Sequence, residues 1–167
     1  MNCTATFLLA GIGNYYLTTL SIWLGHWSSH FPSSPTYGFH VGGHHSLYPD
    51  SKTSLSQRFL YGSGRHDSLF ALLPALIVQA GVVSAVTHSW LRWELLMETT
   101  VVATGVSSLH AQFHTGHAAL NRFAWFRRAR SIHFVHHDRD VNFMVGDHFW
   151  DRVFRTCRSV ELTRRKS

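Results

Sequence analysis

Residues 3–25 form a run of 23 residues without a charged side chain, and this run limits the folds open to the chain. A hydrocarbon core about 30 Å thick is crossed by about 20 helical residues at about 1.5 Å each, so the run is long enough to span a membrane. No basic residue precedes it, and it is longer than the apolar region of a usual signal peptide. We therefore expect a membrane helix here, with a cleaved signal peptide as the alternative.

Two further stretches suit a pair of membrane helices joined by a short turn. Residues 69–87 are uncharged, whereas residues 93–109 are the weaker stretch because they contain Glu94 and Glu98. The connection 88–93 supplies two tryptophans and an arginine, residue types that favour the interface between membrane and water. We expect a transmembrane hairpin, with two buried helices of a soluble protein as the alternative.

The order of these stretches predicts where the polar segments lie. One span followed by a hairpin returns the chain to the side it left, so segments 26–68 and 110–156 are expected to be neighbours. The low share of charged residues, 14% against about 25% in a typical soluble domain, also favours a membrane protein. Almost all Lys and Arg share this side, which makes it cytoplasmic by the positive-inside rule. The expected location is a bacterial inner membrane or the endoplasmic reticulum, and no nucleic-acid partner is expected despite the net charge of +6.

Histidines are concentrated in the two polar segments, in four short clusters. Two clusters are HxxxH pairs directly after an expected span, and two are triplets that end in HH. Residues four apart on a helix share one face, so both rings of an HxxxH pair can reach the same ion. In the first triplet, Gly42 and Gly43 are expected to let the backbone bend so that three rings converge. The ten histidines are His26, His30, His40, His44, His45, His110, His114, His133, His136 and His137.

Ten imidazoles are too many for one metal ion and about right for two. Neutral imidazole suits Fe, Zn, Cu and Ni, and zinc sites take three or four protein ligands. Carboxylates close in sequence are candidates to orient the imidazole N–H groups, namely Asp138, Asp140 and Asp147. Surface or hydrogen-bonding roles are expected for three histidines that fit no such spacing, His66, His88 and His148.

The fold prediction for residues 1–167 is a single all-α domain. We expect an integral membrane bundle of about three transmembrane helices, with a cytosolic helical cap that holds the histidine-rich dimetal site. The two cysteines lie at opposite ends of the chain and argue against a disulfide scaffold or a thiolate metal site.

Two histidine segments resemble a known family. The segment HFVHHDRDVNFMVGDHFWDRVFRT, residues 133–156, is similar to the closing histidine box of the fatty acid hydroxylase/sterol desaturase superfamily, HxxHH with an FWD-x-x-FGT ending. The segment FHVGGHHSLYPD, residues 39–50, is similar to the central box, which in fatty-acyl 2-hydroxylases continues into a proline and an aspartate. The similarity runs from about residue 25 to residue 156.

Three features depart from the family pattern. Three residues separate His40 from His44, where many members have two. Arg155 replaces the glycine of the FGT ending. Three expected membrane helices stand in place of the usual four, as if the leading helix had been lost.

The resemblance implies a non-haem di-iron centre that uses O2 to hydroxylate a C–H bond of a lipid-like substrate, such as a fatty acyl chain or a sterol. It implies that the ten histidines are the iron ligands, with His117 as a further candidate and no separate catalytic acid or base. Zinc is the alternative occupant of the site in the isolated protein. Electrons are expected from a separate donor, such as cytochrome b5 or a ferredoxin with its reductase, because the chain carries no cytochrome b5-like segment. Desaturation of the same substrate class and a non-catalytic metal-binding role are the alternatives.

Overall fold

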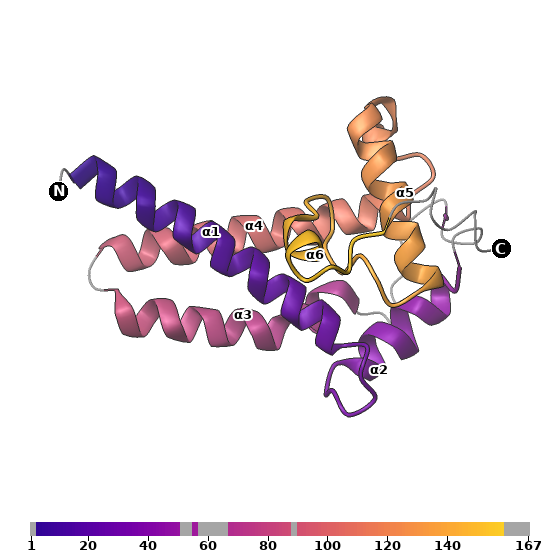
Figure 1. Cartoon of the computed structure of the whole chain (residues 1–167), viewed down its shortest axis with the longest axis horizontal. Helices are drawn as coiled ribbons and strands as arrows, with labels where there is room; N and C mark the ends of the chain where they lie inside the picture. Colours follow the sequence, from indigo (N-terminus) through magenta and orange to yellow (C-terminus); the bar gives the residue numbers. More distant parts are fainter. Residues whose placement is uncertain (1–2, 51–54, 57–66, 88–89, 159–167) are drawn as a thin grey trace.

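The structure is a computed structural model that describes residues 3–50, 55–56, 67–87 and 90–158. Within these residues the regular elements are helices, and one isolated β-bridge joins Ser56 to Thr115. Three long helices contact one another and form a bundle (Figure 1), namely α1 (Cys3–Ser28), α3 (Asp67–Val86) and α4 (Trp90–Phe113). The shorter ones are α2 (Tyr37–Phe39), the π-helix η1 (His40–His45), the 3-10 helix η3 (Ala119–Arg122), α5 (Ala124–Asp138) and α6 (Phe149–Val153). The all-α fold class is therefore confirmed for this part of the chain.

Only one of the described helices has both the length and the hydropathy of a membrane span. It is the α1 segment Ala5–Ser28, and it coincides with the predicted crossing at 3–25. In α3 the apolar stretch Leu73–Ala85 is shorter, and α4 carries Arg92, Glu94 and Glu98 in its first nine residues. The bundle of three membrane crossings, with spans at 69–87 and 93–109, therefore stays a prediction.

A buried polar network joins the three long helices in the middle of the bundle. Asn14 on α1 donates a hydrogen bond from Nδ2 to Oε2 of Glu98 on α4, at 2.9 Å. Gln79 on α3 donates to the hydroxyl oxygens of Thr18 on α1 and Thr99 on α4. Because the helices around this network are otherwise apolar, these bonds set how far each helix slides and rotates against its neighbours.

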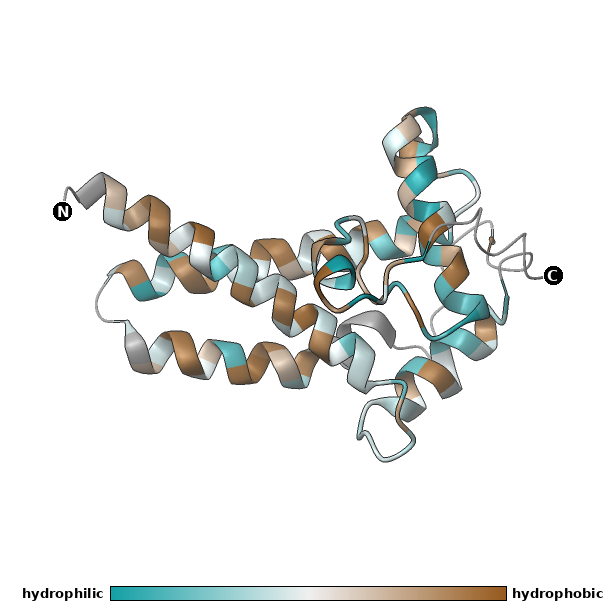
Figure 2. Cartoon of the chain, viewed as in Figure 1, coloured by the Kyte–Doolittle hydropathy of each residue, from teal (hydrophilic) through white to brown (hydrophobic). Residues whose placement is uncertain are grey.

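A helical cap lies at the end of the bundle where α1 and α4 finish (Figure 1). Helix α5 crosses this end, and hydrophilic residues are more frequent in the cap than along the long helices (Figure 2). After α5 the chain returns over the bundle, where Phe143 and Met144 pack against Ile22 and Trp23 of α1 and Ala103 of α4. The polar segments after α1 and after α4 thus meet at one end of the molecule.

Candidate metal centre

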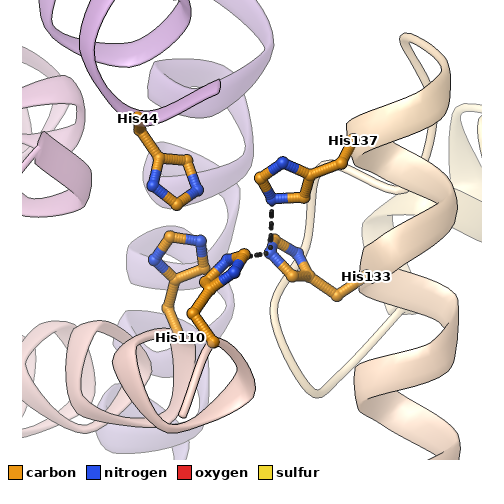
Figure 3. A group of neighbouring side chains, drawn as sticks. His44, His110, His133 and His137 are labelled. Atoms are coloured by element: carbon orange, nitrogen blue, oxygen red, sulfur yellow. Dashed lines mark hydrogen bonds between the residues drawn. The ribbon is translucent and has the colours of Figure 1, made fainter. Parts of the chain in front are cut away.

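The cap holds two groups of histidines whose ring nitrogens face one another. The first, which we call the α4 cluster, consists of His44, His110, His114, His133 and His137 (Figure 3). The second, the α1 cluster, consists of His26, His30, His40 and His136, together with His45. In the α4 cluster, and among the first four residues of the α1 cluster, the facing ring nitrogens all lie within 4.8 Å of one another. The Nε2 atom of His45 lies 3.1 Å from that of His136. The structure therefore brings together all ten predicted histidines.

Helical spacing assigns the rings to the two clusters. The HxxxH pair at the end of α1 lies in the α1 cluster, and the pair at the end of α4 lies in the α4 cluster. On α5, His133 and His137 are four residues apart and point to the α4 cluster. His136, one residue out of that register, points to the α1 cluster. Helix α5 therefore contributes to both sites.

The segment η1 also contributes to both sites, because it winds as a π-helix. With 3.6 residues per turn, five α-helical residues would place His45 about 140° around the axis from His40. The wider winding of a π-helix, with i→i+5 hydrogen bonds, brings the sixth residue back near the first. The Nε2 atoms of His40 and His45 are accordingly 3.2 Å apart in the α1 cluster, while His44 lies in the α4 cluster. The expected bend at the two glycines is therefore wrong, since helical winding makes the rings converge.

Backbone carbonyls hold several rings by their outer nitrogen. The Nδ1 atom of His136 is 2.8 Å from the carbonyl oxygen of Val141, and that of His26 faces the carbonyl oxygen of Phe143. The Nδ1 atom of His137 is 2.6 Å from the carbonyl oxygen of Tyr48. A carbonyl oxygen only accepts hydrogen bonds, so each Nδ1 carries the proton and each Nε2 presents a lone pair to its cluster.

This tautomer assignment favours a cation between the rings. His26 and His136 are both held by a carbonyl at Nδ1, yet their Nε2 atoms are only 2.9 Å apart. Two neutral rings would place two lone pairs against each other at this distance, which is repulsive unless a positive charge lies between them. Two nitrogen ligands about 2.1 Å from one ion lie about 3.0 Å apart at a right angle and about 3.4 Å apart in a tetrahedron. The close Nε2–Nε2 pairs, at 2.9–3.2 Å in both clusters, fit ligands near a right angle, as in five- or six-coordinate ions.

Burial keeps the imidazoles in the neutral form that binds metals. Burial, reinforced by the neighbouring imidazoles, lowers the pKa well below the usual 6.5 for His40, His44, His133 and His136. Burial likewise lowers the pKa of His137 to about 3. Metal binding to these rings therefore needs no displacement of a proton at neutral pH.

The carboxylates predicted to orient the rings occupy different positions. Asp140 accepts a hydrogen bond from Nδ1 of His30, with 2.8 Å between its Oδ1 atom and the ring nitrogen. Asp138 is exposed, and its charge only partly offsets the lowering of the His137 pKa by burial. Asp147 accepts hydrogen bonds from the Tyr15 hydroxyl and the Phe149 amide, and so acts away from the histidines.

Other predicted positions and one unpredicted residue complete the site. His117 is exposed and lies outside both clusters. His148 is buried and has the expected hydrogen-bonding role, with Nδ1 3.3 Å from Asp151. His66 and His88 lie outside the described residues. Asp151 had no predicted role, although it is the aspartate of the FWD sequence at 149–151. Its carboxylate binds Trp23 of α1 and the backbone amides of Phe143 and Met144.

Comparison of the chain with protein-family models, curated proteins and solved structures gives no match. The chemistry of the centre therefore rests on its own geometry: two adjacent sites, each built from five neutral imidazoles.

Proposed function

We propose that the protein is a membrane-bound dimetal oxygenase that hydroxylates a C–H bond of a lipid-like substrate. The observation that carries this proposal is the pairing of two five-histidine clusters at the end of an apolar helix long enough to cross a membrane. The resemblance of residues 133–156 and 39–50 to the fatty acid hydroxylase/sterol desaturase superfamily points to the same activity. In this proposal α3 and α4 also cross the bilayer, and the cap faces the cytoplasm.

The all-imidazole ligand set supports a redox-active ion in each cluster. A structural zinc site needs no more than four ligands, whereas each cluster here offers five. Five neutral nitrogens add no negative charge to the ion, so a bound metal stays electron-poor. Iron held in this way supplies the activation of O2. The protein fixes the ligand geometry and excludes water through the complete burial of rings such as His44, His114 and His133.

An apolar groove near the end of α1 supports a lipid-like substrate, although none of the ten histidines lines it. It has a volume of about 480 Å³ and lies between α1 and α3 at the cap end of the bundle. Its lining includes Leu24, Trp27 and Phe31 from the α1 side and Pro74 and Val78 from α3. Each CH2 group removed from water contributes about 0.8 kcal/mol, so such a surface favours an alkyl chain over a polar metabolite.

Metal analysis of the protein purified in detergent tests the centre. We expect two ions per chain, and loss of bound metal in His45→Ala and His137→Ala. The matched control is His117→Ala, because this histidine is exposed and outside both clusters. Equal metal content in all three variants would contradict the assignment.

Incubation with lipid extracts, O2 and a reductase system tests the reaction. Hydroxylation inserts one oxygen atom of O2 into the substrate and reduces the other to water with two electrons and two protons. The product then gains one oxygen atom. Desaturation by the same site would give a product that has lost two hydrogen atoms. A metal-loaded protein that changes no lipid under these conditions would favour the non-catalytic alternative.

A further inference from the structure

The carboxylate of Asp151 is completely buried, and no metal ligand touches it directly. It accepts hydrogen bonds from the backbone amides of Phe143 and Met144, both at 2.9 Å. It also accepts from Nε1 of Trp23 at 3.0 Å and from the hydroxyl of Thr156 at 2.7 Å. Burial alone would raise the pKa of Asp151, but hydrogen bonds from His148, Thr156, Met144 and Trp23 outweigh it, so the pKa falls below its usual value. The group is therefore ionised at neutral pH and places a negative charge inside the cap.

This charge reaches the α1 cluster through one peptide group. The N–H of Met144 and the C=O of Phe143 belong to the same peptide unit. Its N–H side faces Oδ2 of Asp151, and its C=O side accepts the Nδ1 proton of His26. A negative charge at the N–H end polarises the amide and makes its carbonyl oxygen a stronger acceptor. A stronger acceptor at Nδ1 makes Nε2 of the same imidazole a better electron donor.

We infer that Asp151 is a positioning residue for His26, acting through the peptide group between Phe143 and Met144. The inference rests on the proposed metal centre. The carboxylate holds the ring orientation and the Nδ1–H tautomer of His26, as a carboxylate does when it contacts a metal-bound histidine directly. The carboxylate also accepts a hydrogen bond from Trp23, which lies one helical turn before His26 on α1. It therefore holds the peptide between Phe143 and Met144 in a fixed position relative to the helix that carries His26. The described hydrogen bonds of this peptide go to His26 and Asp151, so the effect is expected at the ion of the α1 cluster.

Cobalt titration of the full-length, metal-depleted protein in detergent tests this role, because the visible absorption of Co2+ reports each histidine site. The wild type is expected to bind two ions. In Asp151→Asn the side-chain NH2 group would face a backbone N–H that the carboxylate accepted before. The peptide between Phe143 and Met144 is then expected to shift, and the cobalt affinity of the α1 cluster to fall roughly 10- to 100-fold. The second site is expected to keep its affinity. The milder variant Thr156→Val removes one hydrogen bond to the same carboxylate and is expected to weaken the same site by a smaller factor.

The control for general destabilisation is Asn14→Ala, which removes hydrogen bonds in the bundle far along α1 from the histidines. It is expected to lower stability and leave both cobalt affinities unchanged. Unchanged affinities in Asp151→Asn and Thr156→Val, with a wild type that binds two ions, would overturn the positioning role and leave the proposed oxygenase intact. Equal weakening of both sites would overturn it in favour of a purely structural role. A wild type that binds no cobalt would overturn the dimetal centre itself.

Discussion

His40 and His45 are five residues apart in sequence, yet their Nε2 atoms lie 3.2 Å apart in the α1 cluster. The π-helical winding of η1 is the cause, because it places the first and sixth residues of the segment on one side. The π-helical winding thus lets both His40 and His45 face the α1 cluster despite the three residues that separate His40 from His44.

Gly42→Ala tests this account of the segment. A Cβ at this position would meet no atom within 4 Å, and the backbone does not need a glycine conformation. We expect unchanged metal content and a gain in unfolding free energy of about 0.5–1 kcal/mol, since glycine weakens helices relative to alanine. The contrasting variant is Gly146→Ala, where φ is +87° and a Cβ would lie 2.8 Å from Leu109, so stability should fall. Loss of metal in Gly42→Ala would restore the glycine-bend explanation.

Asp140→Ala is expected to weaken one of the two metal sites. The carboxylate of Asp140 orients the His30 ring by accepting a hydrogen bond from its Nδ1 atom. This carboxylate is 79% exposed, so a water molecule can take over part of its role as acceptor. We therefore expect a loss of affinity at or below the lower end of the roughly 10- to 100-fold range for ligand-orienting groups, measured by metal titration. Asp140→Asn keeps an acceptor oxygen and should recover part of the loss. The exposed neighbour Arg139 provides a control, since Arg139→Ala should leave both affinities unchanged.

Arg155→Gly is expected to stabilise the protein by about 1 kcal/mol. Arg155 has φ = 60°, a left-handed conformation that strains any residue with a Cβ. This is the position where the family that residues 133–156 resemble has glycine, which adopts this conformation without strain. Chemical unfolding would measure the gain. Arg152→Gly, in helix α6, should have the opposite sign, and a destabilised Arg155→Gly would show that the arginine side chain outweighs the strain.

Asn14→Ala is expected to lower the free energy of unfolding by about 1–3 kcal/mol, because buried partners on α4 lose their donor. Metal content should stay at the wild-type value, since the network is remote from the cap. Thr100→Ala is a suitable comparison, because this exposed hydroxyl bonds only the carbonyl one turn earlier and should change stability little. Equal effects of the two variants would argue that the bundle network contributes no more than a surface hydroxyl.

Removal of metal by a chelator is expected to destabilise the cap. A ligand at about 1,000 times its dissociation constant stabilises the folded state by about 4 kcal/mol per site. In addition, facing lone pairs such as those of His26 and His136 repel when no cation lies between them. The thermal unfolding midpoint should therefore fall on chelation and recover on addition of Fe2+ or Zn2+. An unchanged midpoint in a protein shown to have lost its metal would contradict this coupling.

The amino-acid sequence by itself determined the helical class, the α1 segment apolar enough for a membrane and all ten histidines that converge. These features are local: a run without charge and an i, i+4 spacing constrain the chain wherever they occur. Helical spacing separates His136 from His133 and His137, but only the tertiary structure decided which cluster each of them faces, because that depends on how α5 crosses the bundle end. It also decided that Asp140 and Asp151 support rings while Asp147 does not. Such contacts join residues more than 100 positions apart, as between His30 and Asp140 or Trp23 and Asp151, and no local pattern encodes a distance of that kind.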